Sequence, residues 1–105
     1  MRAGVPALVP HEAAKRVIAK AGLDRYRQHT TGYGMAPGFP PSWGEPLNMF
    51  GGTTDVLQAG MVVSVEPNIF IHDERIGVRL IDNVVITDGA PELLSRYPRD
   101  LIVID

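Results

Sequence analysis

The sequence contains no cysteine among its 105 residues, so neither disulfide bonds nor a thiolate zinc site can hold the fold together. It also lacks a surplus of one charge, since 10 lysine and arginine residues stand against 12 aspartate and glutamate residues. With a net charge of -2, the chain lacks the cluster of basic residues that nucleic-acid binding requires. We therefore expect no nucleic-acid partner.

Long apolar runs are missing as well. No segment approaches the roughly 20 apolar residues that a membrane-spanning helix needs, and the first six residues lack the apolar core of a signal peptide. We therefore expect no membrane partner and a cytoplasmic location. With 45% hydrophobic and 21% charged residues, the composition suits one globular domain over residues 1–105.

An amphipathic helix is predicted near the amino terminus. Apolar residues recur with a helical period between Pro10 and Ala21, and proline suits the first turn of a helix. Gly22 follows, and glycine is the preferred residue where a helix ends in a left-handed conformation.

Residues 32–52 have a different composition, with six glycines and four prolines. This composition argues against a regular helix or a central strand. A flexible linker and an ordered loop both remain open. Phe39, Trp43 and Phe50 are interleaved with the glycines and prolines, which favours an ordered loop in which these aromatic residues pack.

The second half of the chain predicts an antiparallel sheet. Residues 61–66 are rich in β-branched side chains, residues 69–71 extend this strand, and residues 72–74 suit a hairpin turn. Residues 76–86 alternate with period two and predict one long second strand. Residues 92–96 suit a short helical turn, and residues 101–104 a closing strand. A helix followed by these strands predicts an α+β fold.

Three segments carry a resemblance to a known family. Residues 61–67 (M-V-V-S-V-E-P) resemble the G-M-V-x-S-x-E-P strand of creatinase, prolidase and aminopeptidase P. Residues 77–87 (G-V-R-L-I-D-N-V-V-I-T) resemble their G-V-R-I-E-D-x-V-x-V-T strand. Residues 29–34 (H-T-T-G-Y-G) resemble their H-x-x-G-H-G segment. The order and spacing agree over nearly the whole chain.

The resemblance implies half of a pita-bread sandwich, a curved antiparallel sheet with one or two packed helices. The chain corresponds to the carboxy-terminal half of the catalytic domain. The implied activity is hydrolysis of an amide-type C–N bond in a dipeptide-like or small-molecule substrate. Two divalent metals such as Mn, Co or Zn are held in the family by two aspartates, a histidine and two glutamates.

This sequence departs from the family's ligand pattern. Tyr33 stands at the metal-binding histidine, Ile81 stands at the second glutamate, and no segment matches the two aspartates, so only Glu66 remains. Two divalent ions need several anionic ligands to offset their charge, and a phenol keeps its proton near neutral pH. We therefore expect no metal and no cofactor in this chain alone.

The segment from Gly32 to Glu45 also resembles a subgroup that includes ectoine hydrolase, with the pattern G-Y-S-I-G … P-P-x-W-G-E. That subgroup is implied to work without the usual metal pair. Glu66-Pro67 instead follows the metallopeptidase version of the strand, so the substrate stays open.

Four residues are the predicted site. Glu66 and His29 are the candidate catalytic residues: a carboxylate in a partly enclosed pocket serves as general base, ligand or partner of a cation, and His29 matches a family histidine that contacts substrate. Tyr33 and Arg79 are the candidate substrate-binding residues. The plainer alternatives are a solvent-facing Glu66, a surface His29, a Tyr33 that plugs the vacated metal pocket, and a solvated Arg79.

Arg79 is also the predicted ion-pair partner of Glu66, because arginine suits a fork-like contact with a carboxylate. His11 and His72 receive no role. Two functions remain open: a segment of a hydrolase, completed by an amino-terminal half or by a second copy in a homodimer, and a non-catalytic interaction or structural domain that retains the fold. The chain as a fragment of a larger enzyme is a third alternative.

Overall fold

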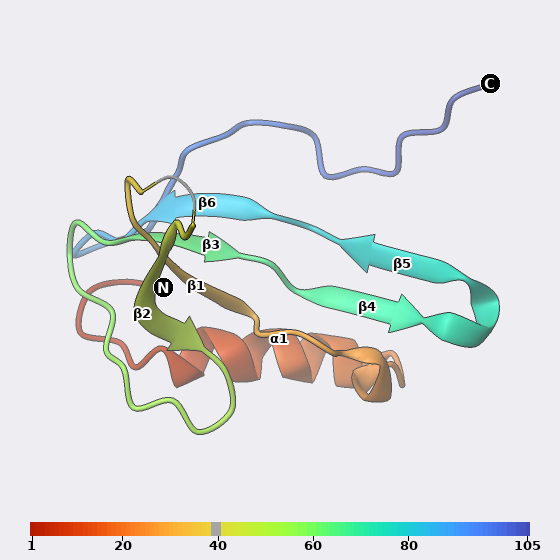
Figure 1. Ribbon diagram of the computed structural model, residues 1–105, viewed down its shortest axis with the longest axis horizontal. Coiled ribbons are helices and arrows are strands. Elements are labelled where there is room, and N and C mark those ends of the chain that lie inside the picture. The colour runs from red at the N-terminus through yellow and green to blue at the C-terminus, as the bar shows by residue number, and fades with distance from the viewer. Residues whose placement is uncertain (39–40) are drawn as a thin grey trace.

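A computed structural model describes residues 1–38 and 41–105, so the predicted packing of Phe39 lies outside the described residues. One helix and two antiparallel sheets make up the fold (Figure 1). The predicted α+β class with a helix packed on an antiparallel sheet is confirmed.

Helix α1 spans Leu8–Lys20 and begins two residues before the predicted Pro10. It ends as predicted, with Gly22 in the left-handed conformation at φ 73°. The backbone N–H of Gly22 donates to the carbonyl of Ala19 at 2.9 Å, which satisfies a helix-end acceptor. A short 3-10 turn, η1 (Asp24–Tyr26), follows.

The larger sheet has the strand order β2-β1-β3-β6-β7. Its strands are β1 (Gly32–Met35), β2 (Gly44–Met49), β3 (Val62–Val65), β6 (Asp82–Val85) and β7 (Glu92–Leu93). The prediction that residues 32–52 contain no central strand is wrong, because β1 lies between β2 and β3. The glycine content reflects close packing: a Cβ atom on Gly32 would collide with the Ser64 carbonyl oxygen and the Met49 side chain.

The smaller sheet is a hairpin of β4 (Asn68–Ile71) and β5 (Ile76–Arg79), joined by the 3-10 turn η2 (His72–Glu74). The predicted hairpin turn is confirmed. The prediction of a single long strand over residues 76–86 is wrong, because Leu80 and Ile81 separate β5 from β6. Pro67 likewise separates β3 from β4, so the hairpin extends beyond the larger sheet (Figure 1).

The carboxy-terminal predictions differ from the structure. Glu92 and Leu93 pair with Val85 and Val84, so a strand replaces the helical turn predicted over residues 92–96. Within the described chain, residues 101–104 form no strand, and the predicted closing strand is wrong. The side chains of Leu101 and Ile104 are each 90% exposed, because this segment packs against no sheet face.

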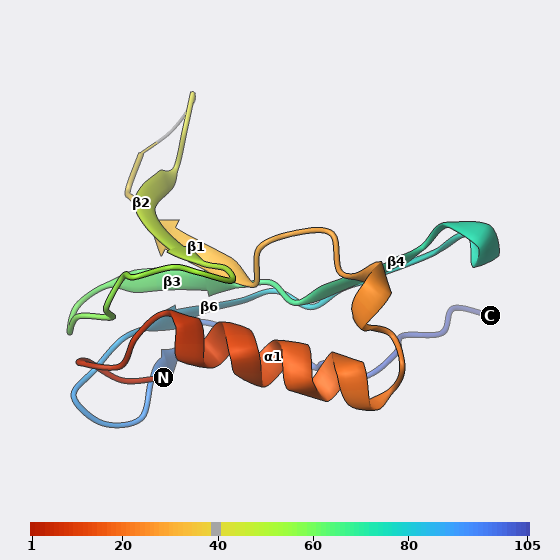
Figure 2. The ribbon, with the colours of Figure 1, turned by 90° about the horizontal axis from the view of Figure 1, so that it is seen from below.

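The hydrophobic core lies between one face of the larger sheet and the start of α1, which runs along that face (Figure 2). Its buried members are Ala7, Leu47, Met49, Leu57, Val63, Val84 and Ile86. Because side chains alternate along a strand, the neighbours of Val63 and Val84 point to the opposite face. That opposite face carries the polar residues described next.

Candidate functional site

A row of polar side chains crosses the face of the larger sheet that points away from the core. Tyr33 of β1, Ser64 of β3 and Asn83 of β6 are partners in register, so their side chains share one face. Glu66 follows Ser64 by two residues and belongs to the same face. We name Tyr33, Ser64, Asn83 and Glu66 the polar row.

Glu66 is only 4% exposed, so the solvent-facing alternative is wrong. The Ser64 hydroxyl donates to Glu66 Oε1 at 2.6 Å. The backbone N–H of Glu66 donates to the Thr31 carbonyl at 2.7 Å, and its own carbonyl accepts from Asn68 Nδ2 at 3.2 Å. These contacts fix both the backbone and the carboxylate, since buried carboxylates need such partners.

Arg79, at the end of β5, supplies the positive charge beside Glu66. The distance from Arg79 Nη1 to Glu66 Oε2 is 3.5 Å, so the predicted ion pair is confirmed. It is a single, long contact and not a fork. The Arg79 side chain is 35% exposed and its guanidinium lies 6.0 Å from the centre of the Phe70 ring, so part of the side chain is accessible to solvent.

Replacing Ser64 by alanine is expected to destabilise the chain by about 1.5 kcal/mol, the usual contribution of a hydrogen bond to a charged group. The change removes the only hydroxyl donor that the structure describes for Glu66. Urea unfolding followed by circular dichroism measures the effect. Ser95→Ala is the matched control, since Ser95 is exposed and no hydrogen bond of its hydroxyl is described, and an equal loss in both variants would contradict the role of the Ser64 hydroxyl.

His29 and Tyr33 line an adjoining pocket of about 380 Å³, together with Trp43 and Asn48. Trp43 Nε1 donates to the Tyr33 hydroxyl at 3.2 Å. The His29 ring is exposed, and its Nδ1 donates to the Thr30 carbonyl at 3.1 Å. The structure therefore groups Glu66 with Arg79 and His29 with Tyr33. None of the described hydrogen bonds or ion pairs joins His29 to Glu66 directly.

The buried His11, which received no role from the sequence, supports this region. It is buried in α1, and its Nδ1 lies 2.9 Å from the Thr31 hydroxyl. Thr31 in turn accepts from the Glu66 backbone, so His11 ties α1 to the strand that carries the site. The signal in the sequence was its spacing of seven residues from Ile18, the other buried residue of α1, which places both on one helix face.

Asn83 was also missed by sequence reasoning. Its Oδ1 is buried and has no hydrogen-bond partner among the described residues. Buried acceptors without a partner are rare in folded proteins. Only the position of Asn83 opposite Ser64 could have identified it as a candidate site residue. That position depends on how β3 pairs with β6, which the sequence does not define.

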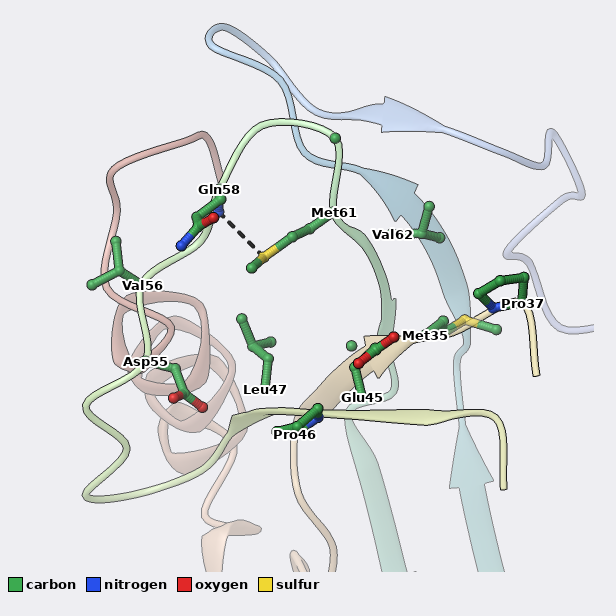
Figure 3. Close-up of a pocket in the computed structure, with 12 residues that line it drawn as sticks. Met35, Pro37, Glu45, Pro46, Leu47, Asp55, Val56, Gln58, Met61 and Val62 are labelled. Carbon is green, nitrogen blue, oxygen red and sulfur yellow. Dashed lines mark hydrogen bonds between the residues drawn. The ribbon is translucent and has the colours of Figure 1, made fainter. Parts of the chain in front are cut away.

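A second cavity, of about 590 Å³, lies between β2 and residues 55–62 (Figure 3). Its lining includes Leu47, Met61 and two carboxylates, Glu45 and Asp55. Asp55 Oδ2 accepts from the backbone N–H of Asn48 at 3.0 Å. The cavity contains none of the four predicted site residues, so it is not the candidate site.

The model of metallopeptidase family M24 matches residues 1–88, and the chain belongs to this family. The resemblance inferred from the three motifs is thereby confirmed.

Among curated relatives, the probable dipeptidase PepE of Mycobacterium tuberculosis is 36% identical over 104 residues, covering 99% of this chain and 26% of that protein. The putative dipeptidase YkvY of Bacillus subtilis is 36% identical over 91 residues, covering 87% of this chain and 24% of that protein. The chain thus spans about a quarter of the length of the curated relatives it matches.

Solved structures of dipeptidases and prolidases resemble this chain. Dipeptidase PepE from Mycobacterium ulcerans matches with a TM-score of 0.83 and 35% identity, covering 96% of this chain and 26% of that one. Prolidase from Thermococcus sibiricus matches with a TM-score of 0.83 and 30% identity, covering 99% and 27%. The predicted half of a pita-bread sandwich is confirmed by this likeness. No described helix has the length and apolar character needed to cross a bilayer.

Metal binding, which the family name implies, can be tested against the side chains present. The Glu66 oxygens already contact Ser64 and the Arg79 cation, and Ile81 is apolar. Across residues 1–38 and 41–105, no three histidine, aspartate or glutamate side chains are grouped as metal ligands. A pair of divalent ions needs several anionic ligands, so the described residues do not fit one.

Proposed function

We propose that this chain forms the carboxy-terminal part of a pita-bread catalytic domain, over residues 1–105, that hydrolyses an amide-type C–N bond. The observation that carries the proposal is the buried Glu66 carboxylate, which lies on the sheet face opposite the core, 3.5 Å from the partly exposed Arg79. A buried carboxylate beside a cation can serve as a general base or as a partner of the substrate. Membership of family M24 supports the same reaction class.

Each predicted site residue has a role in this proposal. Glu66 acts as the general base, or orients the attacking water, because its two oxygens are fixed by Ser64 and Arg79. Arg79 binds the carboxylate of a dipeptide-like substrate through the solvent-accessible part of its side chain. His29 and Tyr33 contact the substrate in the adjoining pocket of about 380 Å³.

The metal pair of the family is not held by this chain alone in our proposal. Manganese, cobalt or zinc would require ligands from further polypeptide, because Tyr33 and Ile81 occupy two ligand positions of the family pattern. The site is completed by an amino-terminal half or by a second copy in a homodimer. The substrate is a dipeptide or a similar small amide, and the protein works in the cytoplasm.

The competing function is a non-catalytic domain that retains the fold. It is favoured by the ion pair between Glu66 and Arg79, because such a pair can serve only to stabilise the fold. The two functions differ in what Glu66 is needed for, and substitution at this position separates them.

Replacing Glu66 by glutamine is expected to reduce hydrolysis of Xaa-Pro dipeptides at least 100-fold, the usual effect of removing a general base. Release of free proline measures the rate, with and without added manganese. Glu45→Gln is the control, because Glu45 is exposed on β2 and outside the polar row, and it should keep full activity.

Binding provides a second measurement that does not need turnover. An Xaa-Pro dipeptide should shift the amide NMR signals of Tyr33, Glu66 and Arg79, and Arg79→Ala should remove these shifts. If the dipeptide causes no shift and Glu66→Gln matches the parent chain in every assay, the hydrolase proposal fails and the non-catalytic domain is favoured.

A further inference from the structure

His11 and Thr31 form a buried polar pair that the proposed reaction does not use. His11 is 6% exposed and Thr31 is 2% exposed. The distance from His11 Nδ1 to the Thr31 hydroxyl is 2.9 Å, and neither side chain has another hydrogen bond among the described residues. Because a well-packed apolar pair often stabilises an interior equally well, the polar contact contributes a fixed geometry more than stability.

Thr31 connects three of the four predicted site residues. It stands two positions after His29 and two positions before Tyr33. Its carbonyl accepts a hydrogen bond from the backbone N–H of Glu66 at 2.7 Å, and its own N–H donates to the Met49 carbonyl at 2.9 Å. The position of Thr31 therefore affects both the buried carboxylate and the segment that lines the adjoining pocket.

The hydrogen bond between Glu66 and Thr31 lies at an end of the pairing between β1 and β3. Thr31 precedes β1 by one residue, and Glu66 follows β3 by one residue. Backbone hydrogen bonds at the ends of strands open more readily than those inside a sheet. A side-chain anchor on Thr31 counteracts this opening, and α1 supplies it from the core face of the sheet (Figure 2).

We propose that His11 is a positioning residue for Glu66 and acts through Thr31. By fixing the Thr31 hydroxyl, His11 keeps the Thr31 carbonyl where it accepts the Glu66 N–H, and the carboxylate stays in place on the opposite face. This role rests on the proposed function, in which Glu66 is the general base. A general base is effective only within hydrogen-bond reach of the proton that it removes.

Amide hydrogen exchange measured by NMR tests this role without a substrate. His11→Leu removes the polar contact and is expected to speed exchange of the Glu66 amide about 10-fold or more. The reference is the Ile86 amide, which donates to the Met61 carbonyl at 2.8 Å at the other end of β3, and its rate should change less than about 3-fold. A merely structural role of His11 would speed both amides equally. That result, or an unchanged Glu66 rate, would overturn the proposal.

Three further variants separate the hydrogen bond from the packing of α1. Ile18→Val trims a buried apolar side chain of the same helix and should leave the ratio of the Glu66 and Ile86 exchange rates unchanged. His11→Asn retains a polar atom near the Nδ1 position and should restore this ratio. Thr31→Val keeps the side-chain shape without the hydroxyl, so it should match His11→Leu, and the two changes together should add nothing more. Additive effects, or no recovery in His11→Asn, would overturn the proposal.

Kinetics distinguish this inference from the proposed function. With an Xaa-Pro dipeptide, His11→Leu should lower kcat about 10-fold and leave KM within about 2-fold, because Arg79 still binds the substrate. His11→Asn should recover kcat. A raised KM with unchanged kcat would overturn the proposal. If the parent chain hydrolyses no dipeptide, the proposed function fails, whereas the exchange rates of the Glu66 amide still decide whether His11 positions Glu66.

Discussion

Gly32→Ala is expected to lower the free energy of unfolding by about 3 kcal/mol or more, which is a large share of the stability of a small domain. A Cβ atom at this position would overlap the Ser64 carbonyl oxygen and the Met49 side chain. Gly32 belongs to the central strand β1, with β2 on one side and β3 on the other. Removing this steric overlap would therefore require both neighbouring strands to move.

Urea unfolding measured by circular dichroism tests this effect. The matched control is Gly44→Ala on β2, where an added Cβ would meet only Ser42 Oγ at 3.6 Å, an ordinary contact. The control should change the unfolding free energy by less than about 0.5 kcal/mol. If Gly32→Ala unfolds at the same urea concentration as the parent chain, β1 and β3 do not approach as closely as described.

Arg79→Met is expected to destabilise the chain by about 2 kcal/mol. Removing one partner of a buried pair usually costs about 3–5 kcal/mol. The expected loss here is smaller, because the Arg79 side chain is 35% exposed and the contact is 3.5 Å long. The cost arises from Glu66, whose carboxylate would remain buried with Ser64 as its described side-chain donor.

A double-mutant cycle isolates the pair. Glu66→Gln removes the charge in place, and its combination with Arg79→Met should restore part of the lost stability, with a coupling energy of about 1 kcal/mol. Arg99→Met is the control, because the Arg99–Asp82 pair lies at the surface and should contribute less than about 1 kcal/mol. A coupling energy of zero between positions 66 and 79 would show that the two groups do not interact.

Several elements could be predicted from patterns among residues that are close together in the sequence. The period of the apolar residues and Gly22 predicted α1, and the β-branched residues on either side of a polar turn predicted the hairpin of β4 and β5. The Glu66–Arg79 pair followed from that hairpin, because pairing brings the end of β5 back to the start of β4. These features depend on residues close together in sequence.

Elements that depend on distant partners were missed. The strands β1 and β2 contain glycine and proline, which are poor strand formers, yet β1 needs Gly32 because two neighbours press against it. The register that sets Asn83 opposite Ser64 is likewise a property of the assembled sheet. Residues 101–104 have strand-like composition, but composition does not supply an edge to pair with.

The break at Pro67 has a mechanical consequence for the polar row. Glu66 belongs to the end of the five-stranded sheet, whereas Arg79 belongs to the separate two-stranded hairpin. The separation of the two charges is therefore set by how the hairpin is placed relative to the larger sheet. The Leu80 N–H, which donates to the Pro67 carbonyl at 3.4 Å, and Asn68 Nδ2, which donates to the Glu66 carbonyl at 3.2 Å, hold that placement. The arginine therefore belongs to the hairpin, and the carboxylate belongs to the larger sheet.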